Sequence, residues 1–176
     1  MAQLSTVHSS NDNYEPEKLK NFLDKVINIL RMDTLIIGWE EKPALFENLI
    51  EGKKGIADEV FLWYPFLSDF PGFNDSHLTI NYKDQKGCGW GGYEGTQVNE
   101  SFKQACPNNP FVLDTSLNEL LKILTKYNFD GVFIDKIRYP SMVNGIDDFL
   151  TCFCPHCHEK AKDEGLDLAL IQKSLN

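Results

Sequence analysis

The stretch Pro110–Asp135, "PFVLDTSLNELLKILTKYNFDGVFID", decides the fold, because a helical pattern is followed directly by a buried-strand pattern. Pro110 stands where the first helical position is expected, and Asn109 precedes it as a candidate cap. Apolar residues then recur at spacings of three and four, which predicts an amphipathic helix. We expect its buried stripe to consist of Leu113, Leu117, Leu120, Leu121 and Leu124. After a turn, the short apolar run at 131–135 predicts a strand covered on both faces.

The same order of elements is found toward the N-terminus. Short apolar runs at 2–8, 33–39 and 59–67 are typical of strands, the first of them weak. Helical periodicity lies between them, at 14–30 and 42–52. After the deciding stretch, helical patterns follow the cysteines to Gly165 and then continue from 166 to 176. Repeated alternation of strand and helix predicts an α/β fold with parallel strands joined by right-handed crossovers.

Charge and composition exclude several classes of protein. The chain has 176 residues and a formal net charge of −9, which argues against nucleic acid as a partner. No apolar run approaches the roughly 20 residues that span a bilayer, so we expect no membrane association. The N-terminus has neither a basic start nor an apolar segment typical of a signal peptide. Unless a leader has been removed, we expect an intracellular, cytoplasmic protein.

The segment 68–109 interrupts the alternation and is rich in Gly, Asn and Asp. Its glycines do not match a phosphate-binding pattern, because no Gly-x-Gly-x-x-Gly follows a strand. Long loops in compact domains are usually functional or partly disordered. Two interpretations are open: an ordered lid or hairpin over a site, and a mobile surface loop.

A second distinctive stretch is "TCFCPHCHEK" at 151–160, which holds three of the five cysteines. An odd cysteine count in a reducing compartment is poor material for a disulfide framework. Thiolates at C-x-C-x-x-C spacing can instead converge on one soft cation, and zinc takes four such ligands. We therefore expect a metal site with a fourth ligand from elsewhere. The alternative is a redox-active or merely buried cysteine cluster.

The residues "CPNNP…LLKILTKYNFDGVFIDKIRYPS" resemble barrel glycoside hydrolases and their uncharacterised glycosidase-like relatives. Cys106 together with Cys152, Cys154 and Cys157 is similar to the zinc site of the family 42 beta-galactosidases. The resemblance covers about 102–163. It implies a (β/α)8 TIM barrel with 131–135 as the fourth strand, and a structural zinc held by these four cysteines. Three residues are rivals of Cys106 as the fourth ligand, namely His156, His158 and, more weakly, Cys88.

In such a barrel Asp135 would lie at the carboxyl end of its strand, where barrel enzymes place catalytic groups. Glycoside hydrolysis requires two carboxylates, and Asp135 is the candidate for one of them. The family 42 enzymes carry Asn-Glu at this point, whereas this chain has Ile134-Asp135. The alternative is that Asp135 pairs with Lys136 or Arg138 to order the loop.

Polar and aromatic residues at the predicted strand ends are candidates for sugar binding, since sugars stack on aromatic rings. The candidates are Trp39, Glu40, Trp63, Tyr64, Arg138 and Tyr139. Aromatic residues at strand ends are core residues about as often as sugar platforms. His8 could face the same cleft, although an exposed or hydrogen-bonded histidine is the plainer interpretation.

A whole barrel takes about 250 residues, and the sequence predicts only about four strand–helix units. We therefore expect one domain, 1–176, that forms the N-terminal half of a barrel. Two functions follow: a glycoside hydrolase incomplete for catalysis, or a non-catalytic half-barrel that binds carbohydrate or assembles. A zinc-ribbon interaction module is disfavoured by the strand–helix order. Open strands need cover, so we expect a homodimer or the remainder of a longer chain.

Overall fold

The structure is a computed structural model, and it describes residues 2–5, 21, 25, 29, 32–38, 43–51, 57–68, 70, 72–86, 89–90, 102–142 and 145–175. The chain divides into two compact units. Unit 1 comprises 1–64 and 120–135, and unit 2 comprises 65–119 and 136–176. Within the described ranges, no helix is both long enough and apolar enough to cross a membrane.

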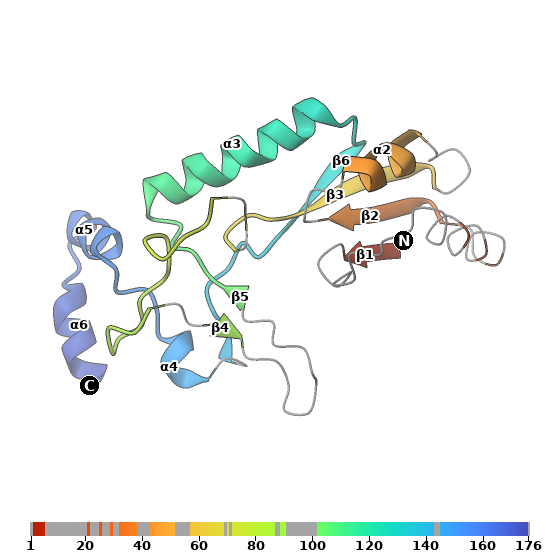
Figure 1. The fold of residues 1–176 in the computed structure, drawn as a ribbon. Helices are drawn as coiled ribbons and strands as arrows, with labels where there is room; N and C mark the ends of the chain where they lie inside the picture. Colours follow the sequence, from red (N-terminus) through yellow and green to blue (C-terminus); the bar gives the residue numbers. More distant parts are fainter. Residues whose placement is uncertain are drawn as a thin grey trace. The chain divides into compact units, whose positions relative to one another are not determined.

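Unit 1 is built around an open sheet (Figure 1). Its strands are β1 (Ala2–Ser5), β2 (Thr34–Gly38), β3 (Glu59–Pro65) and β6 (Gly131–Asp135), in the order β1-β2-β3-β6. β1 pairs with β2 in parallel, and β2 pairs with β3 in parallel. The sequence predicted all of these strands, since each is a short apolar run between polar turns.

The middle of the sheet forms the core of unit 1. Leu35, Ile37, Val60 and Leu62 have exposed fractions of 0%. Leu35 pairs with Val60 and Ile37 with Leu62, so these side chains share one fully covered face of the sheet. Gly131 begins β6 against the ring of Phe61, and an added Cβ would lie 2.7 Å from that ring. A side chain at this position would therefore require the Phe61 ring to move.

Two helices supply cover. The predicted helix at 42–52 is α2 (Pro43–Glu51), which buries Phe46 and Leu49. The ring of Phe46 meets Tyr127 and Phe129 edge-on, with centroids 5.2 and 5.3 Å apart. Tyr127 directly follows α3 (Pro110–Lys126). These aromatic contacts therefore fix the turn that leads from α3 into β6.

The expected buried stripe of α3 is wrong in part. Leu120 is buried and Leu124 half-buried, but Leu113, Leu117 and Leu121 are 41 to 49% exposed. The residues buried on this helix are Val112, Ser116, Leu120 and Ile123. The apolar arc of α3 is broader than the surface that packs against it, so periodicity alone set the stripe about one residue position off.

The expectation of a (β/α)8 TIM barrel, or of its half, is wrong. The part of the chain that the structure describes contains one small open parallel sheet and no eight-fold strand–helix repeat. After β6 the chain forms three helices instead of further strand–helix units. An open sheet with sequential right-handed crossovers has the same local pattern as the start of a barrel. Only closure, which links strand number, tilt and stagger, distinguishes the two.

Unit 2 has little regular sheet. β4 (Gly89–Trp90) pairs with β5 (Phe102–Lys103) in antiparallel fashion, and single bridges join Ser68 to Gln104 and Leu78 to Ala105. The described residues of the 68–109 segment therefore pair with one another through the main chain, and both the lid-or-hairpin and the mobile-loop interpretations stay predictions. Residues 91–101 lie outside the described ranges.

Three helices complete unit 2: α4 (Ile146–Phe149), α5 (Pro155–Asp163) and α6 (Leu168–Leu175). α5 ends where the sequence predicted, with Gly165 at a φ of +76° and the Leu166 N–H bonded to the Ala161 carbonyl. Of the predicted helix at 14–30, Asn21, Lys25 and Ile29 are helical, and the rest lies outside the described residues.

Candidate metal centre

Four cysteines from two distant parts of the chain meet inside unit 2. The Sγ atoms of Cys106, Cys152, Cys154 and Cys157 all lie within 4.8 Å of one another. Their exposed fractions are between 1 and 9%, so the cluster is buried. This is the residue set that the family resemblance implied. The structure therefore brings the predicted ligands together.

Cys106 is positioned by the turn that begins α3. The Asn109 N–H donates to the Cys106 carbonyl at 3.1 Å, which closes the turn. Asn109 then caps the helix, since its Oδ1 accepts the Phe111 N–H at 3.1 Å. The predicted cap and the predicted Pro110 start are both confirmed. Cys106 is thereby fixed just outside a well-formed helix end.

The other three cysteines surround the start of α5. Cys154 is the N-cap residue, in extended conformation, and Pro155 occupies the first turn. Cys157 follows within that turn, so its side chain returns toward Cys154. Cys152 precedes them in the extended segment. The turn at the start of α5 thus brings the three sulfur atoms of the C-x-C-x-x-C motif together.

A third segment, 77–81, joins these two parts by main-chain bonds. The His77 carbonyl accepts the Cys106 N–H at 2.9 Å, and the Thr79 N–H donates to the Gln104 carbonyl at 3.0 Å. On its other side, the Ile80 carbonyl accepts the Phe153 N–H at 2.8 Å. The Ile80 N–H also donates to Cys152 Sγ at 3.4 Å. Residues 77–81 therefore hold both cysteine-bearing segments in register, a role with no signal in the sequence.

The spacing of the sulfur atoms distinguishes a metal site from a disulfide. Cys106 Sγ lies 3.4 Å from both Cys154 Sγ and Cys157 Sγ, whereas a disulfide bond is about 2.05 Å long. All four cysteines are free thiols. Sulfur atoms bound tetrahedrally at about 2.3 Å from zinc lie about 3.8 Å apart. The cluster thus has the donor set and nearly the size of a tetrathiolate metal site.

Close contact among the four thiols raises the pKa of two of them and lowers the pKa of the other two. Hydrogen bonds from Cys106 and Cys152 lower the pKa of Cys154 to about 7, and bonds from Cys106, Cys152 and Cys154 lower the pKa of Cys157. Hydrogen bonds to its three neighbours, together with burial, raise the pKa of Cys106. The pKa of Cys152 is also raised: its bond with Cys106 opposes this, but its bonds with Cys154 and Cys157 and its burial prevail. Like charges this close cannot all ionise unless a cation is present.

Two further side chains contact the cluster. Asn108 Nδ2 donates to Cys157 Sγ at 3.4 Å, as groups that support metal ligands do. Tyr139, which we predicted to bind substrate, packs against the cysteines together with Ile80 and Leu168. Burial and the charge of Cys106, Cys157 and Cys152 raise the pKa of the Tyr139 phenol. His156 and His158 are not members of the cluster.

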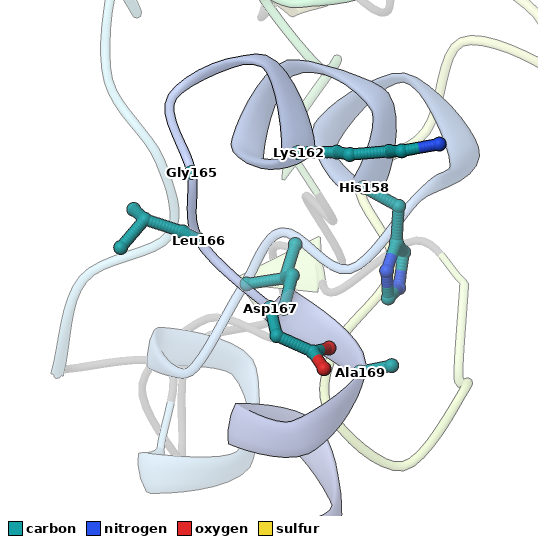
Figure 2. A pocket seen from close by; sticks show the side chains of 7 residues that line it. His158, Lys162, Gly165, Leu166, Asp167 and Ala169 are labelled. Carbon is teal, nitrogen blue, oxygen red and sulfur yellow. The ribbon is translucent and has the colours of Figure 1, made fainter.

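Two pockets lie beside the cluster within unit 2. One, of about 390 Å³, is lined by ten residues that include Cys106, Cys154, Asn109 and His156. The other, of about 550 Å³, lies where α5 turns into α6. Figure 2 shows His158 and Lys162 on α5 and Asp167 at the start of α6. The Asp167 carboxylate accepts the Leu170 N–H at 3.0 Å and so caps α6 itself.

Asp135, the predicted catalytic residue, contacts Trp63, one of the predicted sugar-binding residues. The Trp63 indole N–H donates to Asp135 Oδ2 at 2.9 Å, which joins the carboxyl ends of β3 and β6. Tyr64 is fully buried, the placement expected of a core residue. Arg138 is exposed and donates to the Tyr139 carbonyl at 3.3 Å. Trp39, Glu40, His8 and Cys88 lie outside the described residues.

No protein-family model matches this chain, and no curated protein matches it in sequence. The four-cysteine cluster could hold a metal ion, and this is the chemistry that the geometry itself defines.

Proposed function

We propose that Cys106, Cys152, Cys154 and Cys157 bind one zinc ion whose role is structural. The observation that supports this is the approach of four buried sulfur atoms within 4.8 Å, with Cys106 contacting two partners at once. Four thiolates complete a tetrahedral shell and leave no position for an activating water. A bound zinc would neutralise four thiolates and cross-link the start of α3 to the start of α5.

Donor chemistry narrows the metal to zinc or iron, since a tetrahedral set of four sulfurs selects these two. Elemental analysis of protein purified without added metal tests this, and about one zinc per chain is expected. Cys157→Ser should lose the metal. Cys88→Ser is the matched control, because Cys88 is the weaker rival ligand, and it should keep the metal. A chain that carries iron, or a Cys157→Ser variant that retains full zinc, contradicts the proposal.

Carbohydrate binding or glycoside hydrolysis is the second proposal, favoured by one contact. Asp135 and Trp63 join a carboxylate and an indole at the carboxyl ends of adjacent strands, the residue types that sugar sites use. Hydrolysis needs a second carboxylate, for which no partner is assigned. An enzymatic role is therefore the weaker half of this proposal.

The test of the second proposal compares Asp135→Asn with Asp114→Asn, an exposed aspartate on α3. An amide oxygen can still accept the Trp63 indole N–H, so the fold of the first variant should survive. If carbohydrate is the ligand, Asp135→Asn should abolish sugar-induced changes in tryptophan fluorescence or the hydrolysis of chromogenic glycosides, while the control retains them. No response of the unmodified chain to any sugar removes this proposal and leaves the zinc proposal intact.

A further inference from the structure

The strand β6 combines an edge position with an apolar sequence. It has β3 as its only neighbour among the described strands, and it ends the order β1-β2-β3-β6. Phe133 and Ile134 point to opposite faces, as successive strand residues do. Their side chains are 41 and 45% exposed, whereas Val60 and Leu62 on β3 are fully buried. An exposed apolar edge strand is a template for pairing with another strand.

One hydrogen bond fixes which backbone groups of β6 face the open edge. The Asp130 N–H donates to the Val60 carbonyl at 2.9 Å, so residue 130 faces β3. The N–H and C=O of successive strand residues alternate in direction. Val132 and Ile134 therefore face β3 as well, whereas Gly131 and Phe133 face outward. The outward groups are centred on Phe133.

We propose that β6 pairs in antiparallel fashion with β6 of a second copy of this chain, about a two-fold axis at Phe133. This register places Phe133 opposite Phe133 and Gly131 opposite Asp135. Phe133 faces outward, so the two Phe133 residues at the axis can exchange main-chain hydrogen bonds. Val132 falls opposite Ile134, where apolar side chains approach closely and stabilise the pair.

Charge favours this register as well. Asp135 faces a glycine instead of a second carboxylate, which avoids the destabilising approach of like charges. Just beyond the strand, Lys136 of one copy comes toward Asp130 of the other. A self-complementary patch of this kind is what a two-fold interface requires. The result is a continuous sheet of about eight strands, within the usual range for open sheets.

Sedimentation of the full chain, with Phe133→Lys beside Phe111→Lys, tests the pairing. Phe111 is a matched control because it is an exposed aromatic residue on α3, 68% accessible. The unmodified chain and Phe111→Lys should dimerise. Phe133→Lys should raise the dimer dissociation constant at least roughly tenfold, because two lysines meet at the axis. A monomeric unmodified chain, or a Phe133→Lys variant that dimerises normally, overturns the proposal.

Amide hydrogen exchange of the unmodified chain provides a test that does not depend on a substitution. As concentration rises from monomer to dimer, the Phe133 and Gly131 amides should become protected. The Val132 and Ile134 amides should be protected throughout, since they bond to β3. A dimer in which the Phe133 amide exchanges as fast as in the monomer uses another surface, and this result also overturns the proposal.

Discussion

The Sγ atoms of Cys106 and Cys157 lie 3.4 Å apart although the two residues are 51 positions apart in the chain. A contact between residues so far apart in the chain depends on other segments that hold them in place. Here segment 77–81 does so through main-chain hydrogen bonds to both cysteine-bearing segments. Because the described residues of unit 2 form only short strands, the cluster is a principal link between its parts.

Removing the metal should unfold unit 2 selectively. Structural zinc contributes on the order of 10 kcal/mol to the folding of small zinc domains. A strong chelator should therefore abolish the tertiary signals of unit 2, while the buried sheet of unit 1 persists. Amide exchange can separate the two, with Leu62 and Ala105 as reporters, since both are fully buried. Equal loss of protection at both positions would show that the units unfold together.

Asn108 should tune the metal affinity without binding the metal. Asn108→Ala removes the N–H···S bond to Cys157 and should lower zinc affinity about 10- to 100-fold, the usual range for groups that support ligands. Competition with a chromogenic chelator measures the change. Asn118→Ala, at an exposed position on α3, is the control and should leave the affinity unchanged. An unaltered affinity for Asn108→Ala would mean that the contact does not support the metal.

Zinc binding should release protons and weaken as pH falls. At pH 7 Cys106 and Cys152 carry protons because their pKa values are raised, and Cys154, with a pKa of about 7, is about half protonated. Cys157, whose pKa is lowered, is already a thiolate. Loading the metal should therefore displace about two to three protons at pH 7. Calorimetry in buffers of different ionisation enthalpy measures this number, and a value near zero would contradict four-thiolate binding.

The corrected face of α3 gives a matched pair of leucine substitutions. Leu120→Ala empties a buried position and should destabilise the chain by about 2–5 kcal/mol. Leu117→Ala, at a position 46% exposed, should change stability by less than about 1 kcal/mol. Denaturant unfolding of the two variants measures the difference. Equal costs would indicate that a partner covers Leu117 in solution.

Local structure could be predicted from sequence wherever one short segment contains the signal. The strands β2, β3 and β6 are apolar runs, and α3 carries both its cap and its first proline. The end of α5 near Gly165 could likewise be predicted from the neighbouring residues alone. The four-residue helix α4 was not predicted, because it buries none of its residues and so has no apolar stripe.

Tertiary arrangement could not be predicted in the same way. The strand–helix alternation is common to open sheets and barrels, so the barrel expectation had no local test. Three of the four clustered cysteines were visible as C-x-C-x-x-C, and a family resemblance pointed to Cys106. The role of Ile80 and its neighbours depends on main-chain bonds that any residue type can make. Tyr139 was assigned to a substrate site because aromatic rings stack on sugars, and its packing against the cysteines is a tertiary contact that the sequence does not reveal.

The division of the chain into units has a consequence for its synthesis. Unit 1 is complete in chain order once Asp135 has been made, whereas unit 2 takes residues from both sides of β6. A chain that leaves the ribosome N-terminus first can therefore fold unit 1 while Cys106 still lacks its partners. If the cysteines bind zinc as proposed, unit 2 completes its folding only after Cys157 has emerged and a metal ion has bound. In metal-starved cells, newly made chains should thus accumulate with unit 1 folded and unit 2 unfolded, and proteolysis should begin in unit 2.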